Sequence, residues 1–329
     1  MEEKKFDVKS IIGFVLIFIL LLWVMNNNRP TQEELAKRKA EQEQAAKANN
    51  PQNNTATAAT ADLGAFAYSN AQPTAKDGVT VIENKDVKLT INNKGGDLKE
   101  VLLKQFKTYE SMPVYLIKDK NAIFALNFKT TQGQELNTQQ LYFEPSLSQK
   151  DGKQLLSMKV KTGENSYLEY VYTLPAEGYM VDVAVRSQGL SGVLNSQNPI
   201  ELVWGLKARR MEKSVTYENR YTQSAIRYAD DKINRMSQGG NSGTKEEQVS
   251  WVAYKQHLFT SVLISDSAFA NGDFLSYNIA NEESKDVKYT KNLKSTFPLK
   301  TKGGELSESL HFYFGPSDYN VLKQYNDKY

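Results

Sequence analysis

Cysteine is absent from the 329 residues, and histidine occurs only twice, as His257 and His311. Without cysteine the chain has no disulfides, no thiolate metal ligands and no cysteine nucleophile. Two histidines leave little room for zinc sites or for a catalytic triad. The sequence also shows no phosphate-binding loop, carboxylate–histidine metal cluster or nucleophile motif. No catalytic, cofactor-binding or metal-binding residue is therefore predicted.

A strong excess of charge is also missing, because 41 Lys and Arg residues face 38 Asp and Glu residues, for a net charge of +3. Such a balance argues against nucleic acid as a partner. One segment interleaves aromatic and basic side chains in a way that could stack on bases, with Tyr217, Arg220, Tyr221, Arg227 and Tyr228. Without a basic field around them, these residues are better interpreted as strand and loop aromatics.

Long apolar runs are limited to one uncharged segment, Ile11–Met25. Helical residues rise 1.5 Å each, so the run spans about 22 Å, and its flanking residues extend it to about the twenty that a bilayer requires. Trp23 lies near the distal end, where an indole suits the membrane interface. The residues predicted to form the membrane anchor include Ile11, Phe14, Leu16, Phe18, Leu20, Leu22 and Trp23.

The residues after this run favour a retained anchor over a cleaved signal peptide. A cleavage site needs small residues directly after the apolar run, and this chain has Asn26–Pro30 there, with its first alanine at Ala36. Lysines and arginines occur on both sides of the run, so the charge pattern leaves the orientation open.

The sequence predicts four regions along the chain. Residues 1–28 would hold the N-terminus and the transmembrane anchor, and residues 29–78 a polar linker, partly helical or disordered, because Asn49–Ala61 is of low complexity. Residues 79–315 would form a large domain, and residues 316–329 a C-terminal helix.

Short alternating strands dominate after residue 79. Val87–Ile91 alternates apolar and polar residues, and Gly95 and Gly96 offer the positive φ angles of a tight hairpin before a second strand, Leu98–Phe106. No βαβ spacing appears, so the expected fold is mainly β, a large antiparallel sandwich or barrel. The further predicted strands are Leu155–Val160, Tyr167–Leu174, Met180–Arg186, Leu202–Leu206, Ala225–Tyr228, Trp251–Ile264, Asn292–Leu299 and Leu306–Phe314.

The end of the chain predicts a strand followed by a short helix. Proline cannot donate a ladder hydrogen bond, so the strand should end at Phe314, before Gly315 and Pro316. Gly315 is a candidate for positive φ, and Ser317 is a candidate helix N-cap. The residues expected on one face of the helix are Tyr319, Leu322 and Tyr325, with Tyr319 and Leu322 packing it onto the sandwich.

The remaining polar residues give no pair for acid–base chemistry. His257 and His311 lie within apolar strand patterns and are interpreted as ordinary strand residues. Asp97, Glu169 and Asp182 lie in or beside strands, and solvent-facing positions are expected for them.

A basic cluster precedes the interleaved aromatics. It could contact anionic lipid headgroups or an acidic partner, but a solvated basic loop is the simpler interpretation. Its members are Lys207, Arg209, Arg210 and Lys213.

Three sequence patterns together resemble the N-terminal half of the YidC family of bacterial membrane protein insertases. The first is Asn92–Leu98, with Gly95 and Gly96, followed by Val101–Phe106. The second is Trp251–Phe259, in which Trp251, Lys255 and Phe259 carry the likeness. The third is Phe312–Tyr319, with Phe314, Gly315, Pro316 and Tyr319.

This resemblance implies a topology and a function. The N-terminus would lie in the cytoplasm, and a β-supersandwich similar to galactose mutarotases would lie in the periplasm of a bacterial inner membrane. Five later membrane segments would form a groove that receives nascent membrane proteins, alone or beside the Sec translocon. The groove's arginine belongs to that later half and matches no position here. The implied partners are the lipid bilayer, nascent inner-membrane proteins and Sec translocon components.

The resemblance also implies a non-enzymatic protein. The alternative is a carbohydrate-binding or carbohydrate-active envelope protein on a mutarotase-like sandwich. That alternative needs an acid–base pair across a sugar ring, and the sequence supplies no evident one.

Overall fold

The computed structural model describes residues 62–236, 240–280 and 287–326. The predicted anchor, Ile11–Met25, lies outside these ranges. Within them, no helix is both long enough and apolar enough to cross a bilayer. The described residues belong to one compact unit that starts at Asp62.

The smaller of two antiparallel sheets has four strands in the order β1-β2-β3-β4. Val87, Leu89 and Ile91 of β2 are fully buried as predicted, and Thr90 between the last two is buried as well. Gly95 and Gly96 follow β2 with φ angles of 92° and 65°, which confirms the predicted left-handed turn. The strands are β1 (Val79–Glu83), β2 (Val87–Asn92), β3 (Leu98–Lys107) and β4 (Pro113–Ile117).

The larger sheet has thirteen strands, in the path β6-β5-β11-β16-β15-β17-β10-β9-β8-β7, with β12, β13 and β14 branching from β15. Its first strands are β5 (Ala122–Lys129), β6 (Glu135–Asn137), β7 (Glu144–Lys150), β8 (Lys153–Lys161), β9 (Tyr167–Leu174), β10 (Met180–Gln188) and β11 (Ile200–Arg209). The remainder are β12 (Gln223–Tyr228), β13 (Ile233–Arg235), β14 (Ser242–Lys255), β15 (Phe259–Asn278), β16 (Tyr289–Leu299) and β17 (Ser307–Pro316).

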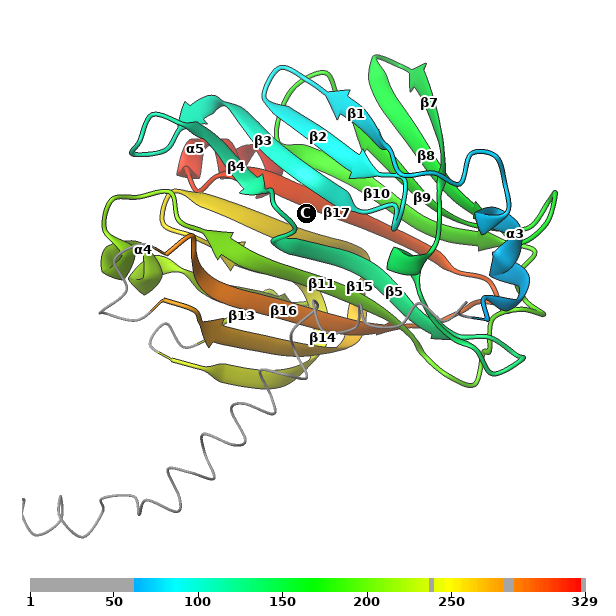
Figure 1. Ribbon diagram of the computed structural model, residues 1–329. Coiled ribbons are helices and arrows are strands. Elements are labelled where there is room, and N and C mark those ends of the chain that lie inside the picture. Colours follow the sequence, from blue (N-terminus) through cyan, green and yellow to red (C-terminus); the bar gives the residue numbers. More distant parts are fainter. Residues whose placement is uncertain (1–61, 237–239, 281–286, 327–329) are drawn as a thin grey trace, which may run out of the picture. The chain divides into compact units, whose positions relative to one another are not determined.

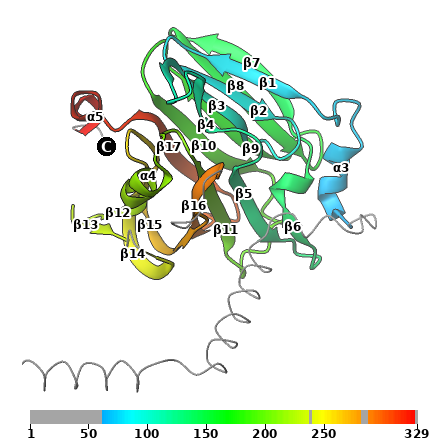
Figure 2. The same ribbon diagram turned by 60° about the vertical axis from the view of Figure 1, so that its left-hand side comes forward.

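The long strand β15 curves the large sheet. Its first part, from Phe259, pairs with β17, and its second part, from Asp273, pairs with β16. β14 follows β15 along the other edge, with a register shift between Val249 and Trp251. Because one strand serves two neighbours in succession, the sheet bends around the core (Figures 1 and 2).

The main core joins buried residues of both sheets, and most of its largest side chains are aromatic. Tyr172 of β9 is fully buried, and its hydroxyl donates a hydrogen bond of 2.8 Å to the carbonyl of Gly96 beside the small sheet. Trp204 of β11 stacks on Tyr254 of β14 with ring centroids 4.0 Å apart. Buried aromatic pairs of this kind add roughly 0.5–1.5 kcal/mol each beyond their area.

The compact unit begins before the residue at which the sequence placed the domain. Residues 29–78 were expected to form a polar linker, partly helical or disordered, and in its described part a 3-10 helix, η1 (Gly64–Phe66), and a short helix, α3 (Ala67–Asn70), precede β1. Phe66 is fully buried, with its ring 5.1 Å from that of Phe128. Leu63 also packs against the core, and the hydroxyl of Ser69 donates to the carbonyl of Tyr142 at 2.6 Å, so several contacts hold this segment in place.

The predicted strand Trp251–Ile264 is wrong as one element, because it is two strands joined by a tight turn. The amide of Gln256 donates to the carbonyl of Phe259 at 2.8 Å and closes the β14–β15 hairpin. The turn residues, Gln256–Leu258, include no glycine or proline to signal it.

Sequence reasoning also missed β1, β4, β5, β6, β7 and β13, as well as a helix, α4 (Val215–Tyr221). β7 has five consecutive exposed residues at the sheet edge, and β13 has only three residues, so neither carries a buried alternation.

Candidate functional site

The second and third family-like patterns meet at one end of the compact unit, although they lie far apart in the sequence. Phe259 pairs with Pro316, and Thr260 pairs with Gly315, at the open end of the β15–β17 ladder. The amide of Ser317 then donates to the carbonyl of Leu258 at 2.7 Å. This end, where β17 passes into a helix, α5 (Tyr319–Asn326), is the candidate site.

Helix α5 docks on the outer face of the large sheet through a small cluster of its own. We call this the docking cluster: buried Met180, Ile264 and Tyr313, with Tyr179, Trp251, Val262, Val321, Leu322 and Tyr325 packed against them. The rings of Tyr313 and Tyr325 lie 5.4 Å apart in an edge-to-face arrangement. Its three buried residues lie outside the main core, but Tyr179 packs against both clusters and so connects α5 to the sandwich interior.

Two tyrosine hydroxyls fix the geometry of this junction. The hydroxyl of Tyr325 accepts a hydrogen bond of 3.0 Å from the backbone amide of Tyr179. The hydroxyl of Tyr313 donates to the carbonyl of Pro316 at 2.7 Å, and burial raises its pKa far above the ordinary range, so it stays a donor. Together they tie the start of β10, the end of β17 and α5 to one another.

Gly315 is required for space rather than for its backbone angle. Its φ is not positive, which corrects the expectation from the sequence. A Cβ atom there would lie 2.6 Å from the hydroxyl oxygen of Tyr313 and 2.8 Å from Cγ of Tyr179. The strand also continues through Pro316 instead of ending at Phe314, because the β10–β17 ladder ends at Tyr313 and Pro316 is paired only with Phe259 of β15.

The N-terminal cap of the helix lies one residue later than predicted, and one expected contact is wrong. Asp318 is its N-terminal cap, since its carboxylate accepts from the amides of Asn320 and Val321, whereas Ser317 was the predicted cap. Leu322 packs in the docking cluster as expected, but Tyr319 is 73% exposed. A helix of eight residues presents one narrow face to the sheet, and Val321, Leu322 and Tyr325 occupy it.

The other predicted motif residues fall in three places. Trp251 packs at the margin of the docking cluster, and Phe259 is buried with its ring 5.3 Å from that of Phe106. Lys255 lies at the end of β14, paired with Gln223 and Thr260. Gly95 and Gly96 belong to the distant β2–β3 turn, where a Cβ on Gly96 would lie 2.9 Å from the ring of Phe143.

Behind the β14–β15 turn lies a polar cluster that sequence reasoning missed. Nδ1 of His257 lies 2.6 Å from a carboxylate oxygen of Glu212, and the imidazole ring lies against Tyr217 and Tyr221. His257 is therefore a turn residue rather than the predicted strand residue. The contacts join α4 to the hairpin.

Glu218 of α4 is buried beneath this surface. Its carboxylate accepts hydrogen bonds from the amides of Met211 and Glu212, which secures the segment after β11. Burial raises its pKa to about 7. Nearby, the ammonium of Lys291 donates to the carbonyl of Thr222 at 2.8 Å, and burial lowers its pKa to about 8. No sequence pattern signals two charged residues that only the fold buries.

Two members of the basic cluster, Arg209 and Arg210, have partners within the unit. Arg209 bonds Asp119 at 2.9 Å, and Arg210 donates to the carbonyls of Glu212 and Lys213. The guanidinium of Arg210 also lies 5.1 Å from the ring of Tyr109, at the tip of the β3–β4 hairpin. The cluster thus connects the hairpin tip to α4.

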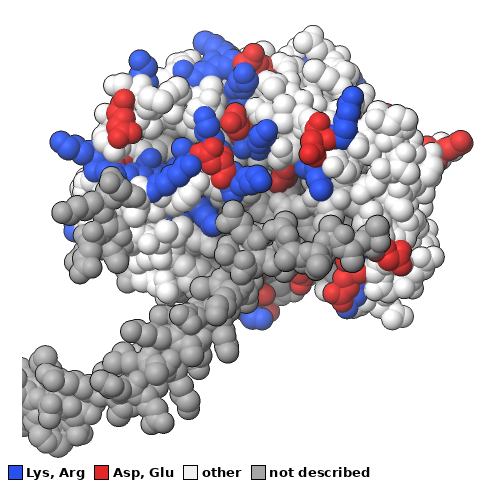
Figure 3. All heavy atoms as spheres, viewed as in Figure 1, with Lys and Arg blue, Asp and Glu red and all other residues white. Residues whose placement is uncertain are grey.

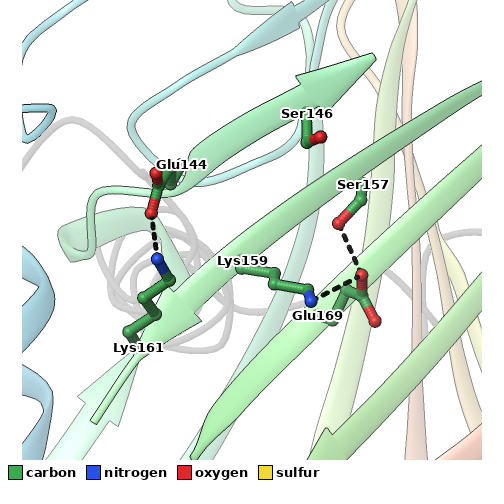
Figure 4. Close-up of a pocket in the computed structure, with 6 residues that line it drawn as sticks. All are labelled: Glu144, Ser146, Ser157, Lys159, Lys161 and Glu169. Carbon is green, nitrogen blue, oxygen red and sulfur yellow. Dashed lines mark hydrogen bonds and ion pairs between the residues drawn. The ribbon is translucent and has the colours of Figure 1, made fainter. Parts of the chain in front are cut away.

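Elsewhere, the outer face of β7, β8 and β9 forms a hollow of about 360 Å³ (Figure 4). Its floor is Glu169, which is buried rather than solvent-facing as predicted. Arg186 lies 2.5 Å and Lys159 3.8 Å from its carboxylate, and Ser157 donates to it. On the opposite wall Lys161 lies 2.6 Å from Glu144. Both carboxylates are held by cations, so the hollow presents no free acid and base for sugar chemistry.

The other two acidic residues also have partners. Asp97 is buried, with its carboxylate accepting from Asn92, and burial raises its pKa. Asp182 bonds Nδ1 of His311 at 2.8 Å, while Nε2 of the same ring contacts Asp266 at 2.8 Å. Burial opposes protonation of His311, but the two aspartates outweigh it and raise its pKa. His311 lies in β17, as the sequence predicted.

A family model described as the YidC periplasmic domain matches residues 79–329. The chain belongs to this family. Membrane protein insertases named YidC are similar over nearly the whole chain. The one from Porphyromonas gingivalis W83 is 31% identical over 97% of this chain and 53% of its own length. The one from Bacteroides fragilis is 30% identical over 96% and 52%. The chain thus spans about half the length of these relatives.

Two solved structures illustrate the range of similar folds. The periplasmic domain of Thermotoga maritima YidC matches 76% of this chain and 89% of its own, with a TM-score of 0.39 and 13% identity. A galactose mutarotase-like protein from Lactobacillus casei matches 73% of this chain and all of its own, with a TM-score of 0.43 and 13% identity.

Proposed function

We propose that this chain is the N-terminal part of a bacterial membrane protein insertase. Residues 11–25 would anchor it in the inner membrane with the N-terminus in the cytoplasm, and the compact unit from Asp62 would lie in the periplasm. The match of the family model to residues 79–329 carries this proposal. Nascent inner-membrane proteins would be its substrates, and Sec translocon components its partners.

Within the insertase, the unit would contribute partner contact rather than chemistry. The docking cluster would hold α5 at a fixed angle to the sandwich, so that the periplasmic unit and the following membrane segments move together. The tyrosine hydrogen bonds and the space reserved at Gly315 support this role. The hollow on β7–β9, with its paired carboxylates, does not favour the carbohydrate-active alternative.

Depletion of the gene in its native host tests the function. Inner-membrane proteins should then fail to reach a protease-protected state, and the wild-type gene should restore them. Normal insertion after depletion would refute the proposal. A sugar-binding screen of the purified protein addresses the alternative.

The orientation can be tested by thiol labelling. Because the sequence contains no cysteine, an introduced cysteine is the only thiol that can react. A single cysteine at Leu147, an exposed residue of β7, should react in intact spheroplasts with a maleimide that cannot cross the inner membrane. Labelling only after lysis would place the unit on the cytoplasmic side and contradict the topology.

A further inference from the structure

Exposed apolar side chains gather at the end of the unit that carries α4, α5 and the β3–β4 tip. We call them the apolar rim: Tyr109, Met112, Tyr217, Leu258 and Tyr319. Met112 is 59% exposed and Leu258 is 52% exposed. Large apolar residues scattered singly are ordinary on a protein surface, but several on converging loops indicate an interaction site.

Contacts between the loops join the segments of the rim into one surface. The amide of Tyr109 donates to the carbonyl of Met211, which links the β3–β4 tip to the segment before α4. The ring of Tyr217 lies 5.1 Å from that of His257, which links α4 to the β14–β15 turn. Leu258 is bonded through its carbonyl to Ser317, just before α5. In Figures 1 and 2, α4 and α5 lie at the same end of the unit.

Basic side chains lie beside the rim, together with two exposed carboxylates: Glu110 accepts a hydrogen bond from the Tyr109 hydroxyl at 2.9 Å, and Asp318 caps α5. Lys107, Lys213 and Arg220 are exposed beside it, on β3, before α4 and on α4. Arg210 lies over the ring of Tyr109. The nearby carboxylate of Asp119 lies within ion-pair distance of Arg209 and Lys288, and that of Glu212 contacts His257. In Figure 3 the Lys and Arg side chains are denser over this half of the visible face than over the other.

We propose that the apolar rim and its basic flank dock on the surface of a bilayer that contains anionic lipid. Tyrosine, methionine and leucine side chains would enter the boundary between headgroups and acyl chains, while Lys107, Lys213 and Arg220 contact phosphates. This combination fits a lipid surface better than a folded protein, because the apolar residues sit on separate loop tips among cations. The inference rests on the proposed function only in placing the unit beside a bilayer.

Single-cysteine variants of the full chain test the docking. Leu258→Cys reports on the rim, and Leu147→Cys on the β7 edge is the matched control, because both leucines are 52% exposed. Each variant carries an environment-sensitive nitrobenzoxadiazole label. The protein is combined with vesicles of phosphatidylcholine and phosphatidylglycerol, with and without doxyl-labelled lipid.

We expect the label at residue 258 to shift to shorter wavelength and to lose roughly half of its emission to doxyl lipid, while the label at 147 changes little. Lys213→Gln with Arg220→Gln should reduce the quenching at 258, and so should vesicles of phosphatidylcholine alone.

Equal behaviour of the labels at 258 and 147 would overturn the proposal, and would favour a protein partner for the rim. If quenching at 258 is the same with and without anionic lipid, and is unchanged by Lys213→Gln with Arg220→Gln, the role of the basic flank is overturned. Either result stands whether or not the chain takes part in insertion, since the vesicles contain no substrate.

Discussion

Gly315→Ala is the sharpest test of the junction between the sandwich and α5. The added methyl group would lie 2.6 Å from the hydroxyl oxygen of Tyr313, 2.7 Å from its Cζ and 2.8 Å from Cγ of Tyr179. All three distances are shorter than real Cβ contacts, so two aromatic rings must move. Overpacking of this kind costs about 1–3 kcal/mol.

The cost should appear as a lower melting temperature. For a unit of this size each kcal/mol shifts the midpoint by about 2–4 °C, so residues 62–326 should melt roughly 2–12 °C lower. Calorimetry measures the midpoint, and limited proteolysis after Phe314 measures the release of α5. Displacing the two tyrosines should increase cleavage there.

Gly192→Ala is the matched control. A Cβ at Gly192 has no heavy atom within 4 Å, and its φ is not positive. This variant should be neutral or gain about 0.4–1 kcal/mol from a less flexible unfolded chain. If Gly315→Ala melts and is cleaved like Gly192→Ala, the junction does not depend on the space at Gly315.

Four further measurements test the docking of α5, the buried Glu218, the compact unit and the N-terminal anchor. Tyr325→Phe should cost about 1 kcal/mol, because it removes the acceptor for the Tyr179 amide, whereas Tyr319→Phe, on an exposed ring, should leave the midpoint unchanged. Burial raises the pKa of Glu218 to about 7 in the folded state, above its value of about 4.3 in the unfolded chain. Protonated Glu218 therefore contributes fully to the free energy of unfolding below about pH 4.3, and this contribution is lost as pH rises through about 7. Stability should therefore fall by up to about 3 kcal/mol between pH 5 and pH 8 in denaturant titrations, and Glu218→Gln should flatten that slope. A fragment of residues 62–326 should be β-rich and unfold cooperatively, and a helical or non-cooperative spectrum would contradict the single compact unit. N-terminal sequencing should find Met1 in carbonate-washed membranes, and a start after Asn28 would show a cleaved signal instead.

Local features of the fold could be predicted from the sequence. The alternation of Val87, Leu89 and Ile91 identifies β2 because burial on one face of a sheet repeats every two residues. Gly95 and Gly96 identify the next turn because positive φ is a property of the residue itself. The family-like patterns at Trp251–Phe259 and Phe312–Tyr319 are short enough to be seen without any structure.

Errors arose where the outcome depended on residues far away in the chain. Phe66 looked like part of a linker until Phe128 covered it, and the hairpin turn at Gln256–Leu258 lacks turn residues because the β14–β15 ladder imposes it. Glu169 seemed solvent-facing by strand alternation, but Lys159 and Arg186 close over it. Each case is a tertiary contact overriding a local pattern.

The sequence by itself determined that this chain is a β protein with one apolar N-terminal segment and a special Gly-Pro pair before a short helix. Only the tertiary structure decided why that pair matters. The space at Gly315 is taken by Tyr313 and Tyr179, and the latter lies on the approach to β10, far earlier in the chain. In the same way, Tyr109, Tyr217 and Leu258 share a surface only because the β3–β4 tip, α4 and the β14–β15 turn lie side by side. Periodicity records which face of a strand is buried, but not which distant segment covers it.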